Sequence, residues 1–340
     1  MAALVASALE AVVALPNLGS VSTFCRESQR VTRLLALNPG SYTLHGTNTF
    51  LVGSGPAKIL VDTGEGKRGY VPLLRQAMSA VGCETIAAVV LTHRHGDHVG
   101  GAAEIASPAA GFGSPPVWKH GGPSGGGLLG GLLGGGGAAT AQAFGDGHVF
   151  AVDGATLVAH HHPGHTEDSV SLYLEEERAL FTGDTILGVG SGTFENLSEY
   201  MKSLKRIRDL DAALGGGFLA LYTGYVPAER PRRRRSAALT NPSPPRHGPT
   251  VKGAGVPRTK IAETLAHRQT RIDQVMDALA AGDGSITDLT ARVYAGRDLS
   301  MALMIGARSN TSAALEYLEA GGQAARRGGV LGLGETWTAV

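Results

Sequence analysis

Three histidines and one aspartate crowd into residues 93–98 of this 340-residue chain, directly after an apolar run. The run, IAAVVL at 86–91, predicts a buried strand, so the polar segment THRHGDH must lie on the loop that leaves it. Imidazole and carboxylate groups are the ligands that Zn²⁺ and similar divalent ions take in proteins. A solvated loop that happens to contain histidines does not explain so dense a group. The sequence therefore predicts a metal centre at the end of a central strand.

Two more polar clusters follow predicted strands. His160, His161, His162 and His165 occur in HHHPGHT after one apolar run, and Asp184 occurs in FTGDT after another. Three clusters at strand ends are not expected by chance. Strand alternation turns at most one of His160 and His161 inward, so we expect both to be solvent-exposed, and His162 to be a loop residue before a proline.

The rest of the pattern indicates an α/β chain. Residues 34–64 alternate short apolar runs with turn signals, which predicts antiparallel strands, and residues 71–81 have helical spacing. Helical periodicity returns from residue 260 onward. Hydrophobic residues make up 43% of the chain, enough to bury a full core in one large domain and a smaller one.

Composition excludes several classes of protein. The 30 Lys and Arg nearly balance the 29 Asp and Glu, which argues against a uniformly basic nucleic-acid coat. Cys25 and Cys83 lie far apart without a CxxC, so the chain can build neither a disulfide framework nor a thiolate zinc cluster, and a reducing interior is expected. No apolar run approaches the roughly 18 residues of a membrane-spanning helix, so no membrane partner is expected.

Two segments interrupt the pattern. Residues 121–137 hold 11 glycines in 17 positions and predict a flexible surface loop. Residues 225–246 combine six arginines with five prolines, which predicts a disordered insertion and is also typical of translated non-coding sequence, such as a retained intron. Its arginine run could contact phosphates, but no aromatic residues are interleaved to stack on bases.

The order THxHxDHxGG, HxPGHT and GD resembles the metallo-β-lactamase superfamily over about residues 34–320. That resemblance implies an αβ/βα sandwich with a dinuclear metal site and a small winged-helix-like C-terminal region. We accordingly expect an N-terminal extension at 1–33, a hydrolase domain at 34–250 and the C-terminal region at 251–340. The segments LNPGSYTLHGTNTFLV, ILVDTG and TGDTILG are most similar to a branch of endoribonucleases that is mitochondrial in animals.

The resemblance also implies the ligands of two divalent ions, expected to be Zn²⁺. One ion is assigned to His93, His95 and His165, and the other to Asp97 and His98, with Asp184 bridging both. In the family a GHGP histidine completes the second site, whereas here Tyr225 follows Gly224 and HGP occurs only at 247–249. We therefore expect the segment 225–246 to split the motif and His247 to be the last ligand. A one-ion enzyme with Tyr225 in place of that ligand is the alternative.

Other residues take their expected roles from the same resemblance. Asp97 is the catalytic residue that orients a bridging hydroxide, and Asp62 resembles a carboxylate that fixes a ligand histidine, although a turn cap explains Asp62 as well. His45 and Asn48 lie on a loop that faces the active site in the family, so substrate contact and simple hairpin chemistry are both open. In the last domain, His267 and Arg268 resemble a His-Arg pair of the family, and ordinary helix-surface positions explain them equally well.

The expected function is a metal-dependent endoribonuclease that cuts single-stranded RNA by attack of the bridging hydroxide on phosphorus. A thioester or small-ester hydrolase with the same site is the first alternative, and an inactive RNA-binding protein is the second, if the insertion breaks the second metal site. Single-stranded RNA is the expected partner, and a homo-oligomer stays open. By resemblance the protein is expected inside the cell, in the mitochondrial matrix or the cytoplasm.

Overall fold

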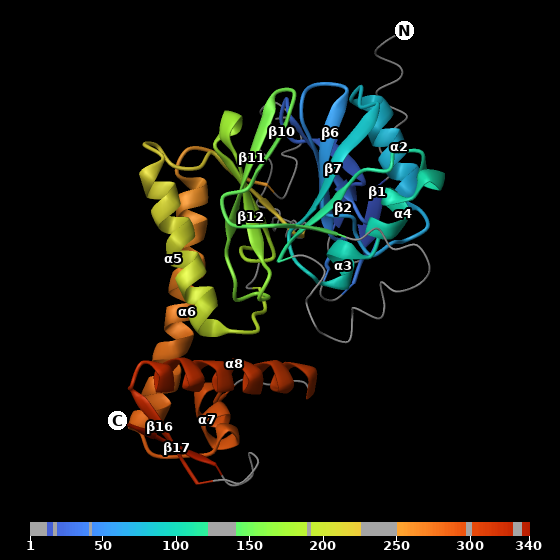
Figure 1. Ribbon diagram of the computed structural model, residues 1–340. Coiled ribbons are helices and arrows are strands. Elements are labelled where there is room, and N and C mark those ends of the chain that lie inside the picture. The colour runs from blue at the N-terminus through green and yellow to red at the C-terminus, as the bar shows by residue number, and fades with distance from the viewer. Residues whose placement is uncertain are drawn as a thin grey trace, which may run out of the picture.

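Two β-sheets face each other in the computed structural model, which describes residues 12–15, 19–40, 43–121, 141–188, 192–225, 250–296, 301–328 and 335–340 (Figure 1). The first sheet has seven strands, in the spatial order β3 (Phe24–Arg26), β4 (Val31–Leu35), β5 (Asn48–Val52), β6 (Ala57–Val61), β7 (Thr85–Leu91), β8 (Val117–His120) and β9 (Gln142–Phe144). Pairing is antiparallel from β3 to β6 and parallel from β6 to β9. The antiparallel strands predicted within residues 34–64 are confirmed.

The second sheet has six strands, in the order β10 (Val149–Val152), β11 (Ala155–His161), β12 (Val170–Leu174), β13 (Ala179–Gly183), β14 (Ala220–Thr223) and β15 (Val251–Lys252). Only β13 and β14 pair in parallel. Short 3₁₀ turns lie at Pro108–Ala110 and Glu175–Glu177, and β1 (Val12–Leu15) forms a separate hairpin with β2 (Gly19–Ser22).

Helices cover the outer face of each sheet (Figure 1). The first sheet carries α2 (Tyr70–Ala80) and α4 (Ala102–Ala106), with the short α3 (Gly96–Val99) at the end of β7, and the second carries α5 (Leu197–Ala213) and α6 (Val256–Ala280). The predicted helix spacing at 71–81 buries Leu73, Leu74 and Ala77 of α2 against the first sheet. The predicted αβ/βα sandwich is therefore confirmed.

The layer between the two sheets is filled by aromatic and branched side chains. Phe50 of β5 meets Phe181 of β13 edge to face, with ring centroids 5.1 Å apart, and Phe181 stacks on Tyr222 of β14 at 4.8 Å. Each fully buried side chain of this size stabilises the fold by about 1.5–3 kcal/mol. This packing holds the ends of β7, β13 and β14 in fixed positions relative to one another.

The C-terminal residues form a small helical region with a two-stranded wing. It consists of the lower part of α6, α7 (Ile286–Val293), α8 (Met301–Ala320), β16 (Ala324–Arg327) and β17 (Thr336–Ala339). Ser285 and Asp288 form a reciprocal capping box at the start of α7. Leu315 and Trp337 share one apolar core with Leu204 of α5, so the boundary expected at 250 separates segments that pack together. The division into domains stays a prediction.

The first sheet begins earlier than the sequence predicted. Residues 1–33 were expected to be an extension, but β3 and most of β4 lie within them and pair in the sheet. The reason is Arg33, a charged residue that is only 2% exposed because its Nε lies 3.2 Å from Glu27 Oε1. A buried ion pair hides the strand from a hydrophobicity pattern.

Two segments with predicted properties lie mostly outside the described residues. Apart from Gly121, the glycine-rich segment 121–137 lies outside the described residues, and so does the segment 225–246 apart from Tyr225. Among the helices that are described, none has the length and apolarity needed to cross a bilayer.

Candidate metal centre

The predicted ligands meet at one edge of the sandwich, where several strands end. Asp62 follows β6, His93 follows β7 by two residues, and Asp184 follows β13 directly. His165 lies on the loop between β11 and β12. Because the carboxyl ends of neighbouring strands open onto the same edge, residues far apart in the chain come within contact distance.

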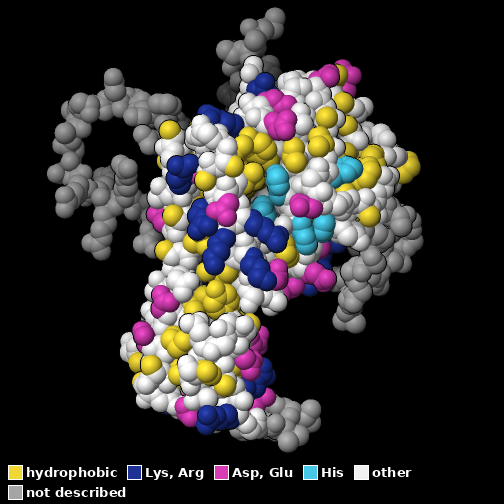
Figure 2. Space-filling model, turned by 60° about the vertical axis from the view of Figure 1, so that its left-hand side comes forward, with side chains coloured by type: hydrophobic (Ala, Val, Ile, Leu, Met, Phe, Trp, Pro, Cys, Tyr) yellow, Lys and Arg dark blue, Asp and Glu magenta, His cyan; other side chains and the backbone are white. Residues whose placement is uncertain are grey.

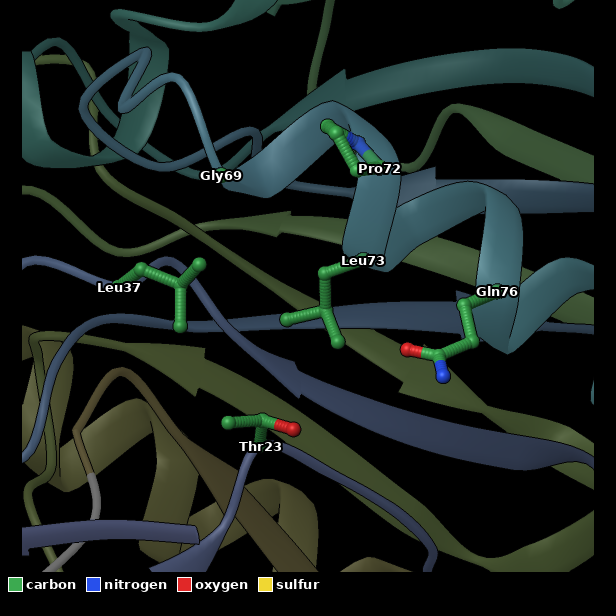
Figure 3. A pocket seen from close by; sticks show the side chains of 6 residues that line it. All are labelled: Thr23, Leu37, Gly69, Pro72, Leu73 and Gln76. Carbon is green, nitrogen blue, oxygen red and sulfur yellow. The ribbon is translucent and has the colours of Figure 1, made fainter. Parts of the chain in front are cut away.

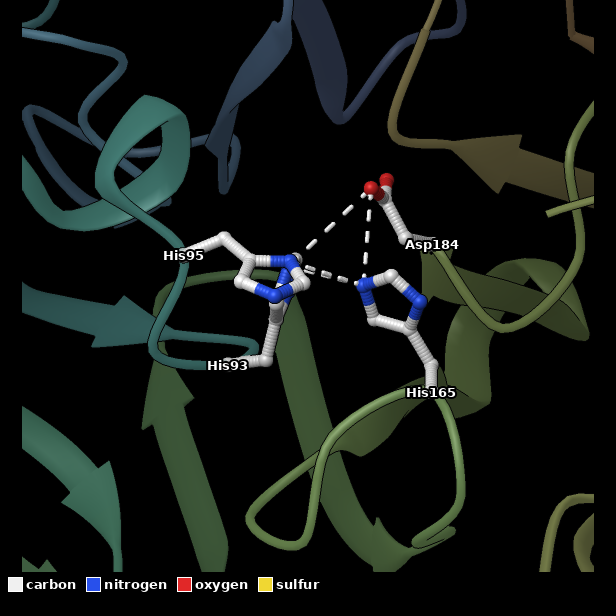
Figure 4. Close-up of side chains that lie close together, drawn as sticks. All are labelled: His93, His95, His165 and Asp184. Atoms are coloured by element: carbon white, nitrogen blue, oxygen red, sulfur yellow. Dashed lines mark hydrogen bonds and ion pairs between the residues drawn. The ribbon is translucent and has the colours of Figure 1, made fainter. Parts of the chain in front are cut away.

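The first group contains three imidazoles and one carboxylate (Figure 4). His165 Nε2 lies 3.2 Å from His93 Nε2 and 3.0 Å from His95 Nδ1, and those two nitrogens are 3.1 Å apart. Asp184 Oδ2 lies 3.7 Å from His165 Nε2 and 4.0 Å from His93 Nε2. A tetrahedral zinc site has ligand-to-ligand edges of about 3.3 Å, so this donor set fits a divalent ion.

A second group shares Asp184 with the first. His98 Nε2 lies 3.4 Å from Asp97 Oδ2 and 3.4 Å from Asp184 Oδ1. Both His98 Nε2 and Asp184 Oδ1 are buried and have no hydrogen-bond partner in the described part of the chain. Buried polar atoms normally have a partner, so these two orphaned atoms fit a second cation. The two oxygens of Asp184 thus face different donor groups, as a bridging carboxylate requires.

Asp62 fixes both histidines nearest to it. Its carboxylate accepts hydrogen bonds from the backbone N–H and hydroxyl of Thr92, both at 2.8 Å, and lies 2.8 Å from His98 Nδ1. The Thr92 hydroxyl in turn lies 3.0 Å from His93 Nδ1. Asp62 has a φ of 58°, a left-handed conformation uncommon for aspartate, which aims the carboxylate at these groups. The contacts match a carboxylate that orients a ligand histidine rather than a turn cap.

His165 is oriented from its other side by a backbone carbonyl. Its Nδ1 donates to the carbonyl oxygen of Thr193 at 2.8 Å, which leaves Nε2 free to face the first group. The preceding Gly164 has a φ of 125°, and a Cβ there would lie 2.2 Å from the backbone nitrogen of Tyr200. Only glycine lets the loop that carries His165 pack this closely on α5.

Tyr225 lies inside the centre, where only the one-ion alternative had placed it. It was expected to open the disordered insertion, but it is buried, bridges to Thr47, and donates from its hydroxyl to Asp97 Oδ2 at 2.6 Å. Thr47 donates to the same oxygen at 3.0 Å. The hydroxyls of Tyr225 and Thr47 thus both donate to one oxygen of Asp97.

Gly224 is needed beside this contact. A Cβ at Gly224 would lie 2.0 Å from Asp184 Oδ1, closer than any side chain tolerates. The strand that leads to Tyr225 can thus pass next to Asp184 only with glycine at this position.

Burial and neighbouring charges shift the pKa values of several residues in the centre. Burial, and then the neighbouring imidazoles beginning with that of His98, hold the pKa of His93 well below its usual value. Burial alone would lower the pKa of His98, but the charges of Asp184 and Asp62 raise it well above its usual value. Burial and the charges of Asp184 and Asp97 raise the pKa of Tyr225, which keeps it a neutral donor. Neutral His93 is the protonation state that a metal ligand requires, whereas a cation beside His98 would have to displace the second proton that the two carboxylates favour there.

The remaining predicted residues have other surroundings. His45 and Asn48 are 0% and 1% exposed, so neither is accessible for the substrate contact that was considered. Asn48 instead donates to the Thr223 carbonyl at 2.8 Å and joins β5 to the end of β14. Nothing in the sequence indicated this burial, because an asparagine in a turn-rich segment is typical of a hairpin turn. His247 lies outside the described residues.

Of the three histidines beside the ligand loop, His160 and His161 differ from expectation, whereas His162 lies in the loop after β11 as predicted. His160 and His161 end β11 and are half-buried rather than exposed, because each stacks on another histidine, His162 and His120 respectively. His162 is fully buried and bonds to the Ser171 hydroxyl at 3.0 Å. None of them joins the donor groups described above.

A separate hollow of about 460 Å³ lies along α2 (Figure 3). Its lining contains no charged side chain and consists of Thr23, Leu37, Gly69, Pro72, Leu73 and Gln76. None of these residues belongs to the metal centre.

Solved structures from other organisms share this architecture. A beta-lactamase domain protein from Burkholderia ambifaria matches with a TM-score of 0.69 and 18% identity, over 96% of this chain and 95% of its own. A metallo-beta-lactamase family protein from Thermus thermophilus matches with a TM-score of 0.63 and 22% identity, over 93% and 100%. These likenesses support the fold alone.

The sequence comparisons identify the family. The model of the metallo-beta-lactamase superfamily matches residues 42–214. A "Beta-lactamase-like protein 2 homolog" of Caenorhabditis elegans is 35% identical over 306 residues, 89% of each chain. An "Atrochrysone carboxyl ACP thioesterase" of Aspergillus novofumigatus is 34% identical over 271 residues, 78% of this chain and 79% of the relative. The chain belongs to the metallo-β-lactamase superfamily, and it is a hydrolase of that type with a His/Asp metal-binding cluster. The predicted family and enzyme class are confirmed.

Proposed function

We propose that the protein is an endoribonuclease that cuts single-stranded RNA with two divalent ions, most simply Zn²⁺. One observation carries the two-ion proposal: two donor groups share Asp184, and the second group contains two buried atoms that need a partner. The choice of RNA rests on the sequence resemblance to endoribonucleases. The match to the Caenorhabditis elegans relative, which spans 89% of both chains, supports it.

The residues of the centre have different proposed roles. When bound, divalent ions activate water near neutral pH and stabilise negative charge that develops at phosphorus. His93, His95 and His165 would hold the first ion, and Asp97 and His98 the second, with Asp184 between them. Asp97 would orient the attacking water, since its side chain is 20% exposed whereas that of His98 is fully buried. Hydrogen bonds from Thr47 and Tyr225 fix the orientation of that carboxylate.

His247 is proposed as the ligand that completes the second group. The motif that would hold it is split at Gly224, where Asp184 and Asp97 lie close to the chain. Deleting residues 225–246 would join Gly224 to His247 and remove Tyr225. We expect the deletion variant to bind two ions per chain at least as tightly as the full chain. Failure of both the deletion variant and the full chain to bind a second ion would contradict the dinuclear proposal.

Positive side chains near the centre support a polyanionic substrate. Figure 2 shows Lys and Arg side chains gathered on the same face as several histidines. Helix α5 exposes Lys202, Lys205, Arg206 and Arg208. Lys202 pairs with Glu199 and Arg208 with Asp209, whereas the charge of Arg206 reaches His162 on the strand beside the ligand loop. Phosphate contacts by such residues would make RNA binding weaken as salt rises.

A thioester hydrolase is the second candidate, because the relative from Aspergillus novofumigatus carries a thioesterase name at similar identity. The ligand spacing does not separate the two substrates. An inactive RNA-binding protein is the third candidate, if His247 cannot reach the centre.

The test compares two substrates with and without chelator. The full chain is incubated with a labelled unstructured RNA and, separately, with an acyl thioester. We expect chelator-sensitive cleavage of the RNA. Chelator-sensitive cleavage of the thioester alone would replace the endoribonuclease assignment with the second candidate. Metal analysis of the same preparation completes the test, since RNA binding without bound metal and without cleavage would favour the third.

A further inference from the structure

Arg268 is a buried cation in the middle of α6. It is 4% exposed, and its guanidinium lies 4.8 Å from the ring centroid of Phe194 and 5.4 Å from that of Tyr200. In the described part of the chain its close partners are these rings and a backbone carbonyl rather than a carboxylate. Burying a cation without a carboxylate is costly. Aromatic faces and a carbonyl offset only part of that cost, so the position calls for another explanation.

One short segment, residues 192–196, connects the Arg268 guanidinium with the metal centre. Arg268 donates to the carbonyl oxygen of Gly192, which is adjacent to Thr193. The Thr193 carbonyl accepts the hydrogen bond from His165 Nδ1 at 2.8 Å. The backbone N–H groups of residues 195 and 196 donate to the Gly164 carbonyl at 2.8 and 3.1 Å. Residues 192–196 therefore hold the ligand loop on both sides of His165.

Tyr200 closes the other side of this arrangement. Its ring lies under the guanidinium, its hydroxyl donates to the Thr185 carbonyl at 2.6 Å, and its backbone contacts Gly164. The same aromatic residue thus touches the chain just after Asp184, the loop of His165, and Arg268. Packed atoms therefore connect Arg268 with the chain beside both Asp184 and His165.

We propose that Arg268 is a positioning residue for the metal ligand His165. It fixes residues 192–194, so that the Thr193 carbonyl holds the imidazole in the tautomer and orientation that present Nε2 to the ion. The C-terminal helix α6 thereby becomes part of the metal centre's support. The inference rests on the metal site of the proposed function but not on the choice of RNA as substrate.

The same helix provides a matched control. Arg258, ten residues before Arg268, pairs with Asp211 of α5 at 2.7 Å and joins the same two helices. It does not contact residues 192–196 or the His165 loop through any hydrogen bond or ion pair of the described residues. Its replacement removes an arginine contact between α5 and α6 without touching the support of His165.

The experiment measures Co²⁺ binding to the full chain and its Arg268→Met and Arg258→Met variants, by chelator competition and by the visible ligand-field spectrum. Outer contacts of metal-bound histidines typically contribute ten- to a hundredfold to metal affinity. We expect Arg268→Met to weaken Co²⁺ binding by about tenfold or more and to alter the spectrum, whereas Arg258→Met leaves both close to wild type.

Two results would overturn the inference: unchanged affinity and spectrum in Arg268→Met, or equal losses in both variants. If Arg268→Met does not fold, Phe194→Leu replaces it. That variant removes the ring beneath the guanidinium and is expected to shift affinity and spectrum in the same direction by a smaller factor, and wild-type behaviour would count against the inference. A wild-type chain that binds no Co²⁺ would refute the metal site itself, which is distinguishable from equal binding by all variants.

Discussion

The two donor groups of the metal centre are built differently. In the first, Thr92 and Thr193 orient His93 and His165 by direct hydrogen bonds, and all four donor residues are described. In the second, Asp97 and His98 are also held in place, by Thr47 and Asp62. What differs is the last neighbour: the hydroxyl of Tyr225 occupies one oxygen of Asp97 where another ligand was expected.

The difference follows from how each residue reaches the centre. The first group comes from residues within a few positions of the ends of buried strands, so the sheet that forms the core also sets the ligand positions. The last member of the second group depends on the chain that leaves β14, and that chain carries the split motif. The first donor group should therefore tolerate changes around residue 225, and the second should not.

The largest effect is expected from breaking the first group. His165→Ala removes one of three close imidazoles and should abolish binding of the first ion. Loss of the several kcal/mol that a metal contributes to the transition state corresponds to a fall in hydrolysis on the order of a thousandfold. His161→Ala is the control, because His161 is four residues away and, among the described residues, its ring contacts the Glu167 carbonyl and His120 rather than a donor group. Full metal content in His165→Ala, by elemental analysis, would refute the ligand assignment.

A smaller effect is expected when the support of the second group is weakened. Asp62→Asn keeps the size of the side chain but removes the charge that faces His98 Nδ1. Binding of the second ion should weaken by about ten- to a hundredfold, with a smaller change in the first. Asp168→Asn is the control, since Asp168 pairs with Lys119 at 2.6 Å and contacts neither donor group through an ion pair. Titration with Zn²⁺ in a calorimeter separates the two binding steps, and equal losses in both steps would contradict the selectivity.

Tyr225→Phe should shift the comparison in the opposite direction. The phenol competes for Asp97 Oδ2, so its removal is expected to strengthen binding of the second ion by up to about tenfold, the worth of one hydrogen bond. Tyr222→Phe serves as control, because that residue lies on β14, the strand that precedes Tyr225, and stacks on Phe181 instead. If Tyr225→Phe weakens binding of the second ion, the phenol is itself a ligand and does not compete with the ion for Asp97 Oδ2.

Much of this centre could be predicted from sequence for a physical reason. The residues that the structure brings together in the two donor groups lie in dense polar clusters next to buried strands, as in THRHGDH and FTGDT. A strand of apolar residues fixes where the next few residues lie, so local order in the sequence becomes order in space. The same reasoning predicted an α/β chain and the helix at 71–81, whereas the αβ/βα sandwich was implied by the family resemblance.

What could not be predicted depends on contacts between distant residues. Arg33 lies within a strand because Glu27 neutralises it, and no periodicity reveals such a pair. Tyr225 is buried at the centre because Asp97, 128 positions away, accepts a hydrogen bond from its hydroxyl. For Arg268, an ordinary helix-surface position explained the sequence as well as the family's His-Arg pair did. The residue is buried because Gly192 and two aromatic rings surround it. Each of these contacts buries a residue whose type and local sequence, taken alone, predict an exposed or loop position.

The smallest effect on the metal centre, and the clearest dependence on pH, is expected from Glu27→Gln. Buried Glu27 contacts Arg33, Thr250 and Lys252, and so fixes the start of β15 beside β14. Burial alone would raise the pKa of Glu27, but Lys252 and then Arg33 lower it below its usual value. The ionised carboxylate therefore adds stability above the ordinary carboxyl pKa of about 4.3, and this is lost as pH falls through the lower folded value.

Urea unfolding of wild type and Glu27→Gln should accordingly differ by about 3 kcal/mol near pH 7, and the difference should shrink as pH falls below about 4.3. Glu177→Gln is the control, because Glu177 accepts from Ser28 near the same sheet edge but lies 3.7 Å from Arg30, a weaker pair. At pH 7 we expect binding of the second ion, which lies beside β14, to change by less than about twofold and that of the first not at all, since both donor groups are held by their own contacts. A difference in unfolding free energy that stays constant with pH would show that the charge of Glu27 is not what stabilises this edge.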